Sequence, residues 1–105
     1  MLSWINVGGE KVFPSEVEDT MLVHPKIKDL VIVGIPDELK GEASKAFIQL
    51  KEGETSSLEE IRAFCKPRMA PYKVPVAVEF VYEIPRSAAG KALRRLLRDK
   101  EWKDH

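Results

Sequence analysis

The chain has 105 residues, enough for a single domain over residues 1–105 with one modest hydrophobic core. Hydrophobic residues make up 44% and charged residues 32%, a balance typical of a folded globular protein rather than a disordered one. The 17 basic and 17 acidic residues cancel, so the net charge favours neither a nucleic-acid partner nor a membrane surface. Basic residues do gather near the C-terminus, between Arg86 and Lys103.

We expect neither a membrane-spanning segment nor a signal peptide in this sequence. The longest apolar run, Leu30 to Ile35, is too short to span a bilayer. A charged segment followed by an apolar one does not open the chain, so we expect no signal peptide. Cys65 is the single cysteine, which rules out an intrachain disulfide and fits a reducing compartment. These features predict a cytoplasmic protein. The strand-like start directly after Met1 fits either a native N-terminus or a fragment cut at a domain boundary.

The first predicted elements are a hairpin and a helix. Residues 4–13 form two short apolar segments around Gly8-Gly9, a pair that supplies the positive φ angles of a tight turn. Pro14 fits the first position of a helix, and the acidic residues after it are favourable at the N-terminal end of the helix dipole. We expect His24-Pro25 to end this helix, because a residue before proline avoids helical geometry.

Three core strands are predicted. Leu30 to Ile35 is β-branched and short, as in a buried strand, and Pro36 to Glu42 should be a loop. Residues 44–51 alternate in hydrophobicity and form the second strand, which ends before a turn at Gly53-Glu54. The third strand, over residues 76–82, should direct a period-2 stripe into the core: Val76, Val78, Phe80 and Tyr82.

Two further helices complete the predicted fold. Ser57 and Glu60 form a capping box that opens a helix with an apolar face containing Cys65. Residues 66–75 contain three prolines and should be irregular. A last helix is predicted from Ala92 to about Lys100, with an apolar face of Leu93, Leu96 and Leu97 and a solvated face of Arg94, Arg95 and Arg98. The fold class is therefore α+β, a three-stranded sheet flanked by helices and preceded by a short β-hairpin.

Several kinds of catalytic site are excluded by composition and spacing. Two distant histidines and one cysteine do not form a metal site, and the glycines match neither a P-loop nor a dinucleotide fingerprint. His24 is better explained as a helix terminator than as a catalytic base. Cys65 is better explained as a core residue than as a nucleophile.

Lys91 is the strongest single candidate for a functional residue. It follows Gly90, and a cationic amphipathic segment comes after it. A lysine on a mobile tip can reach into another surface, and its compact ammonium donates up to three hydrogen bonds to carboxylate or phosphate oxygens. Because most lysines are solvated surface residues, the meaning of this one depends on the other motifs of the chain.

Four segments, taken in order, carry a family resemblance. They are Gly8-Gly9-Glu10-Lys11-Val12-Phe13-Pro14-Ser15-Glu16-Val17-Glu18; then His24-Pro25, Gly34-Ile35-Pro36-Asp37-Glu38 and Gly41-Glu42; then Met69-Ala70-Pro71-Tyr72-Lys73-Val74-Pro75; and Glu83-Ile84-Pro85-Arg86-Ser87-Ala88-Ala89-Gly90-Lys91-Ala92-Leu93-Arg94-Arg95. This series resembles the C-terminal domain of the adenylate-forming (AMP-binding) superfamily, which includes acyl-CoA synthetases. The amino-acid sequences of these motifs are most similar to those of fatty-acid-CoA ligases and other acyl-CoA ligases.

The resemblance implies a two-step reaction. Family members join a carboxylic acid to the α-phosphate of ATP, giving an acyl-adenylate and pyrophosphate, and a nucleophile such as the CoA thiol then displaces AMP. A large N-terminal domain, absent from this chain, holds most of the ATP, Mg²⁺ and acid. The small C-terminal domain caps the site in two orientations, one for each half-reaction. Alone, this chain is expected to be inactive and to bind no cofactor.

The resemblance also assigns roles to residues. Lys91 matches the lysine that enters the site for adenylation, and Gly90 would let its loop approach the nucleotide. Gly8 and Gly9 match the turn that lines the path of the CoA arm in the second orientation. Three basic residues are candidates for the CoA phosphates: Lys11, Lys73 and Arg86.

The sequence departs from the family pattern at two positions and leaves alternatives open. Asn6 stands where lysine is common, and Ser87-Ala88-Ala89 replaces a more hydroxyl-rich segment, which puts a hydroxyl contact there in doubt. One alternative is an amino-acid adenylation domain that uses a carrier-protein thiol. Others are a standalone phosphate- or nucleic-acid-binding module, which the neutral charge disfavours, and a partner-binding domain without chemistry. The acid substrate cannot be inferred.

Overall fold

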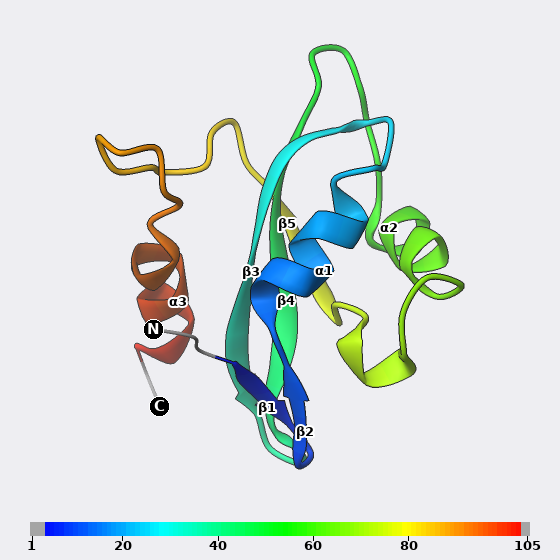
Figure 1. Ribbon diagram of the computed structural model, residues 1–105, viewed down its shortest axis with the longest axis vertical. Helices are drawn as coiled ribbons and strands as arrows, with labels where there is room; N and C mark the ends of the chain where they lie inside the picture. The colour runs from blue at the N-terminus through cyan, green and yellow to red at the C-terminus, as the bar shows by residue number, and fades with distance from the viewer. Residues whose placement is uncertain (1–3, 104–105) are drawn as a thin grey trace.

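The computed structural model describes residues 4–103. Within them, the strands form one sheet and the helices pack against it (Figure 1). The elements are β1 Ile5–Val7, β2 Glu10–Val12, α1 Pro14–Met21, β3 Ile27–Asp37, β4 Gly41–Leu50, α2 Leu58–Cys65, the 3₁₀ helix η1 Pro71–Lys73, β5 Ala77–Phe80 and α3 Arg94–Trp102. The expected α+β class is confirmed.

The longest pairing in the sheet is the antiparallel ladder between β3 and β4. Both strands are longer than predicted: only residues 38–40 form the turn between them, and Pro36 pairs with Glu42 in the ladder. The other edge of β4 has two neighbours. β5 runs parallel to β4, and β1 joins it antiparallel where Val7 lies opposite Gly41.

The N-terminal hairpin is part of this sheet, whereas the sequence predicted a separate ribbon before it. The backbone N–H of Asn6 donates to the Glu42 carboxylate at 3.0 Å. The N–H of Gly8 donates to the carbonyl of Lys40 at 2.9 Å. These contacts extend the single β1–β4 pair and join the hairpin to the β3–β4 turn. Within the described residues the sheet therefore has five strands, where three were predicted.

Helices cover both faces of the sheet: α1 and α2 lie on one side and α3 on the other (Figure 1). The larger hydrophobic core lies beneath α1 and α2. Figure 1 shows β3 and β4 between these two helices and α3. The smaller core beneath α3 contains Val31, Val33, Phe47, Ile84 and Leu97. Successive residues of β3 serve the two cores alternately, because strand side chains point to opposite faces.

The sequence predicted the start of α2 correctly but not the end of α1. α2 begins as predicted, and the Ser57 hydroxyl accepts from the Glu60 N–H at 3.2 Å. α1 ends at Met21, three residues earlier than predicted. The chain then turns, with the N–H of His24 donating to the Met21 carbonyl at 3.0 Å. His24 is buried and packs edge-to-face on Phe64, so it is a structural residue within the turn.

β5 is shorter and more exposed than predicted. Of the predicted core stripe, only Val78 packs against the larger core. Val76 is 47% exposed, Phe80 is 39% exposed, and Tyr82 lies beyond the end of the strand and is fully exposed. Because β5 is an edge strand that pairs with β4, its side chains have fewer neighbours than those of the central strands. The prediction of a buried stripe is wrong for these three residues.

α3 begins two residues later than predicted, at Arg94. Ala92 instead forms an isolated bridge with Arg86, and the N–H of Leu93 donates to the Pro85 carbonyl at 2.8 Å. The helix continues to Trp102, whose indole N–H donates to a carbonyl of β3 at 2.7 Å. Non-local contacts therefore set both ends of this helix.

The faces of α3 also differ from the prediction. Leu97 is buried, but Leu96 is 55% exposed, so the apolar face is narrower than expected. Arg94 does not belong to a solvated face. Its guanidinium donates to the Ile32 carbonyl at 3.0 Å and to the Glu18 carboxylate at 2.6 Å. This contact fixes α3 to β3 and α1.

Candidate functional site

A closed loop, yellow to orange in Figure 1, carries Lys91. The bridge between Arg86 and Ala92 closes the loop. Within it, the N–H of Ser87 donates to the Lys91 carbonyl and the N–H of Gly90 donates to the Ser87 carbonyl, both at 2.8 Å. Gly90 has a φ angle of +82°, which L-residues with a β-carbon rarely adopt. The Lys91 side chain is exposed, and no ion pair in the described part of the chain involves it.

Arg86 holds this loop against the sheet. Its Nε and Nη2 donate to both carboxylate oxygens of Asp29 on β3, at 3.0 Å and 2.6 Å to Oδ2. Its Nη1 donates to the carbonyl of Gly90 at 2.9 Å. The guanidinium predicted to bind a CoA phosphate is therefore engaged within the domain.

The Gly8-Gly9 turn has the geometry expected from the sequence. Gly8 and Gly9 have φ angles of +59° and +90°, and they connect β1 and β2 directly. The N–H of Gly9 donates to the side-chain oxygen of Asn6 at 2.9 Å. The departure from the family pattern at Asn6 thus has a local use, because its amide stabilises the turn.

The two other predicted basic residues lie near this hairpin. Lys11 is on β2, with its Nζ 4.6 Å from the centroid of the exposed Trp4 ring. Lys73 ends η1, which contacts β2. Its ammonium pairs with the Glu16 carboxylate at 2.6 Å, and this hydrogen bond raises the pKa of Lys73 above its ordinary value. The structure therefore brings Lys11 and Lys73 to the hairpin side of the domain.

The predicted residues form two groups at opposite ends of the sheet (Figure 1). The Lys91 loop is attached at Asp29, and the Gly8-Gly9 turn lies beside the turn that follows Asp37. These two positions on β3 are eight residues apart, about 26 Å at a strand rise of about 3.3 Å per residue. The two groups therefore cannot contact the same reacting atoms in one orientation of the domain.

Two partner residues were missed by the sequence reasoning. Glu16 was explained by the helix dipole alone, and its pairing with Lys73 has no local signal because 57 positions separate them. Asp29 did carry a weak signal. Ile27 and Leu30 are both apolar and three residues apart, which breaks the alternation of a regular strand and indicates a bulge.

A match to a known family decides where this domain belongs. The family model described as the AMP-binding enzyme C-terminal domain matches residues 16–91, well over half of the chain. The chain belongs to this family. The matched segment begins in α1 and ends at Lys91, so it includes η1 and the closed loop as far as Lys91.

Relatives of this AMP-binding C-terminal domain include CoA ligases. A long-chain-fatty-acid–CoA ligase of Bacillus subtilis is 46% identical over 101 residues, which is 96% of this chain and 18% of that protein. A crotonobetaine/carnitine–CoA ligase of Proteus mirabilis is 46% identical over 93 residues, 89% of this chain and 18% of that protein. The crystal structure of a Brucella canis acyl-CoA synthetase superposes with a TM-score of 0.91 at 32% identity, covering 96% of this chain and 19% of the other. This AMP-binding C-terminal domain thus spans less than a fifth of the length of these relatives.

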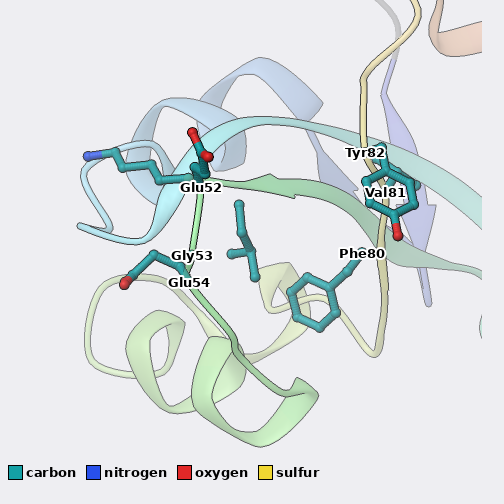
Figure 2. Close-up of a pocket in the computed structure, with 8 residues that line it drawn as sticks. Glu52, Gly53, Glu54, Phe80, Val81 and Tyr82 are labelled. Carbon is teal, nitrogen blue, oxygen red and sulfur yellow. The ribbon is translucent and has the colours of Figure 1, made fainter.

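A surface hollow of about 510 Å³ lies beside the C-terminal ends of β4 and β5. Figure 2 shows it between the turn at Glu52, Gly53 and Glu54 and the end of β5, where Phe80 and Tyr82 lie. None of the sequence-predicted site residues lines it. Its charged lining residues, Lys51, Glu52 and Glu54, lie outside the motifs that carry the family resemblance, so we do not assign the hollow to the active centre of this AMP-binding C-terminal domain.

Residues 4–103 offer no metal site, no membrane-spanning helix and no exposed thiol. Among residues 4–103, no three His, Cys, Asp or Glu side chains are grouped so that they could hold a metal ion. In the same range, no helix has the length and apolar character needed to cross a bilayer. Cys65 is buried in the larger core, and burial raises the pKa of its thiol, which suits a packing residue rather than a nucleophile.

Proposed function

We propose that this chain is the mobile C-terminal domain of a larger acyl-CoA synthetase. The full enzyme joins a carboxylic acid to AMP with release of pyrophosphate, and then transfers the acyl group to the thiol of CoA with release of AMP. An N-terminal domain outside this chain binds ATP, Mg²⁺ and the acid. Membership of the AMP-binding family supports the proposal, as does the short stretch of the CoA ligases that the chain covers.

The observation that carries the proposal is the exposed Lys91 ammonium on a loop held to the sheet. The attacking carboxylate and the α-phosphate of ATP are both anionic, so an ammonium placed between them offsets their repulsion and stabilises the charge of the transition state. It also holds the reacting atoms in the geometry of attack. Because Lys91 has no ion-pair partner in the described part of the chain, it loses no internal contact when it enters the site.

The other end of the domain would serve the second half-reaction. There the Gly8-Gly9 turn offers backbone without side chains, which suits the narrow pantetheine arm of CoA. Lys11 lies beside the turn on β2 and can meet a CoA phosphate. Lys73 can do so if it exchanges its Glu16 partner for the phosphate. The separation of about 26 Å along β3 then requires the domain to turn between the two half-reactions.

The acid substrate would be chosen by the missing domain. The relatives from Bacillus subtilis and Proteus mirabilis are equally identical to this chain but are named for different acids. We also propose that the isolated chain is inactive, because the nucleotide and acyl pockets would lie in the N-terminal domain. A cytoplasmic location fits the unoxidised, buried Cys65.

The test separates the two half-reactions in the full-length enzyme, with Lys91→Ala and a control, Lys100→Ala, which removes an exposed lysine from α3. Acid-dependent pyrophosphate release should fall about 10²–10³-fold for Lys91→Ala only. Transfer from preformed acyl-adenylate to CoA should be unchanged in both variants. Transfer to a carrier protein but not to CoA would favour the amino-acid adenylation alternative. Normal adenylation by Lys91→Ala would contradict the proposal.

A further inference from the structure

The direction in which the Lys91 loop points is not set by hydrophobic packing. None of the residues from Arg86 to Lys91 is buried. The hydrogen bonds within the loop close it on itself but do not attach it to the rest of the domain. Ile84 and Ala92, on either side of the loop, pack in the smaller core and anchor its base, so the orientation of its tip is left to polar contacts with another element.

Arg86 supplies such contacts from within the loop. Its bidentate pair with Asp29 fixes the plane of the guanidinium, because two parallel hydrogen bonds allow little rotation. The same guanidinium donates to the carbonyl of Gly90, the residue directly before Lys91. Asp29 is fixed in turn, because its Oδ1 accepts from the N–H of Leu30 at 2.9 Å. An unbroken series of contacts thus connects the backbone of β3 to the Gly90–Lys91 peptide.

A bulge in β3 gives Asp29 the required direction. The ladder between β3 and β4 shifts register between Ile27 and Asp29. In a regular strand these two residues would face the same side. Here Ile27 packs in the larger core beneath α1 and α2, whereas Asp29 points to the opposite face, where Arg86 lies. Bulges are known to redirect side chains in this way.

We propose that Arg86 and Asp29 form a positioning pair that aims Lys91 for the adenylation half-reaction. The inference rests on the proposed function of Lys91 and adds two residues to it. It also replaces the prediction that Arg86 binds a CoA phosphate, since the Arg86 donors already have acceptors in the domain. Because the pair is partly exposed, with side chains 39% and 22% accessible, it should contribute little to stability.

A double-mutant cycle in the full-length enzyme tests this directly. Arg86→Ala and Asp29→Ala should each lower the rate of pyrophosphate release by about 10²-fold, since a displacement of about 1 Å can have that effect. In a Lys91→Ala background, neither substitution should lower the rate further, because each acts only through Lys91. Arg86→Lys should not restore the rate, because an ammonium cannot contact both Asp29 and Gly90 in the same fork geometry.

Two controls make the result specific. Arg68→Ala removes another exposed arginine that donates to a backbone carbonyl, that of Phe64, and it should leave pyrophosphate release unchanged. The melting temperatures of the Arg86 and Asp29 variants should stay close to that of the parent. The KM for CoA should also be unchanged.

The outcomes separate this inference from the function on which it rests. If Lys91→Ala abolishes adenylation but the Arg86 effect adds to it in full, the positioning role is wrong and the proposed function stands. A raised KM for CoA with normal adenylation in Arg86→Ala would instead assign Arg86 to CoA. If Lys91→Ala leaves adenylation intact, both proposals are overturned.

Discussion

Gly9 and Gly53 have similar positive φ angles of +90° and +82°, and the structure leaves open space around the β-carbon position of each. They lie in turns at opposite ends of the sheet: Gly9 at the tip of the β1–β2 hairpin, and Gly53 beyond the end of β4. Replacing either with alanine should destabilise the fold to a similar extent, roughly 1–2 kcal/mol, because a β-carbon is disfavoured at positive φ.

The matched pair isolates the proposed use of the hairpin turn. In the full-length enzyme, Gly9→Ala should slow transfer from acyl-adenylate to CoA by about 10²-fold, because its methyl group displaces the thiol arm. Gly53→Ala should transfer at the parent rate despite its similar loss of stability. Rapid-quench measurement of thioester formation, with urea unfolding as the measure of stability, checks both. Equal transfer rates in the two variants would show that Gly9 serves only the hairpin.

Arg94 gives a prediction about stability alone. Its removal in Arg94→Ala leaves the half-buried carboxylate of Glu18 with the Ile32 N–H as its remaining partner, at 2.8 Å. Burial already raises the pKa of Glu18, so the loss of the cation should be costly, about 1–3 kcal/mol in the free energy of unfolding. The control is Arg98→Ala, which removes an exposed arginine that stacks on Trp102. A similar loss in both variants, measured by urea unfolding, would contradict this assignment.

His24 should make the stability of the chain depend on pH. Burial lowers the pKa of the His24 imidazole, and the charges of Lys26 and Arg68 act in the same direction while Glu60 opposes them. The unfolded chain, with a histidine pKa of about 6.5, then binds the proton more strongly than the folded chain. Stability should therefore be full above about pH 6.5 and should fall as the pH drops below it.

The His24→Asn variant tests this pH dependence. Asparagine keeps an acceptor for the Lys26 N–H, which in the parent donates to His24 Nδ1 at 3.1 Å, but it does not titrate. The variant should be less stable at every pH because it loses the ring packed on Phe64. Its melting temperature should lose less between pH 7 and pH 5 than that of the parent. Parallel curves would exclude His24 as the titrating group.

Features encoded by neighbouring residues could be predicted from the sequence. The Gly8-Gly9 turn and the start of α2 at Ser57 depend on contacts within four positions, and both are confirmed. The burial of Phe80 depends on which elements pack nearby, and that prediction was wrong. Hydrophobic alternation cannot tell an edge strand from a central one, because the pattern gives the face of a residue but not its neighbours.

The residues of the candidate site also differ in whether the sequence alone could identify them. Lys91 and Gly90 could be identified because a motif places them next to each other in the chain. Asp29 was not identified, since it is 57 positions from Arg86 and lies in a bulge ahead of the predicted strand, where the only signal was the spacing of Ile27 and Leu30. The pairing of Arg86 with Asp29 was missed for the same reason, because the sequence does not show which partner a basic residue has in the fold.

The continuous ladder between β3 and β4 has a consequence for the order of events in the proposed enzyme. Because the two strands pair along almost their full length, the two ends of the domain move as one body. Bringing the hairpin turn to the reacting centre must therefore withdraw the lysine loop from it. Mutual exclusion of this kind would keep the CoA thiol away until pyrophosphate formation is complete, without any need for the enzyme to bind CoA more weakly beforehand.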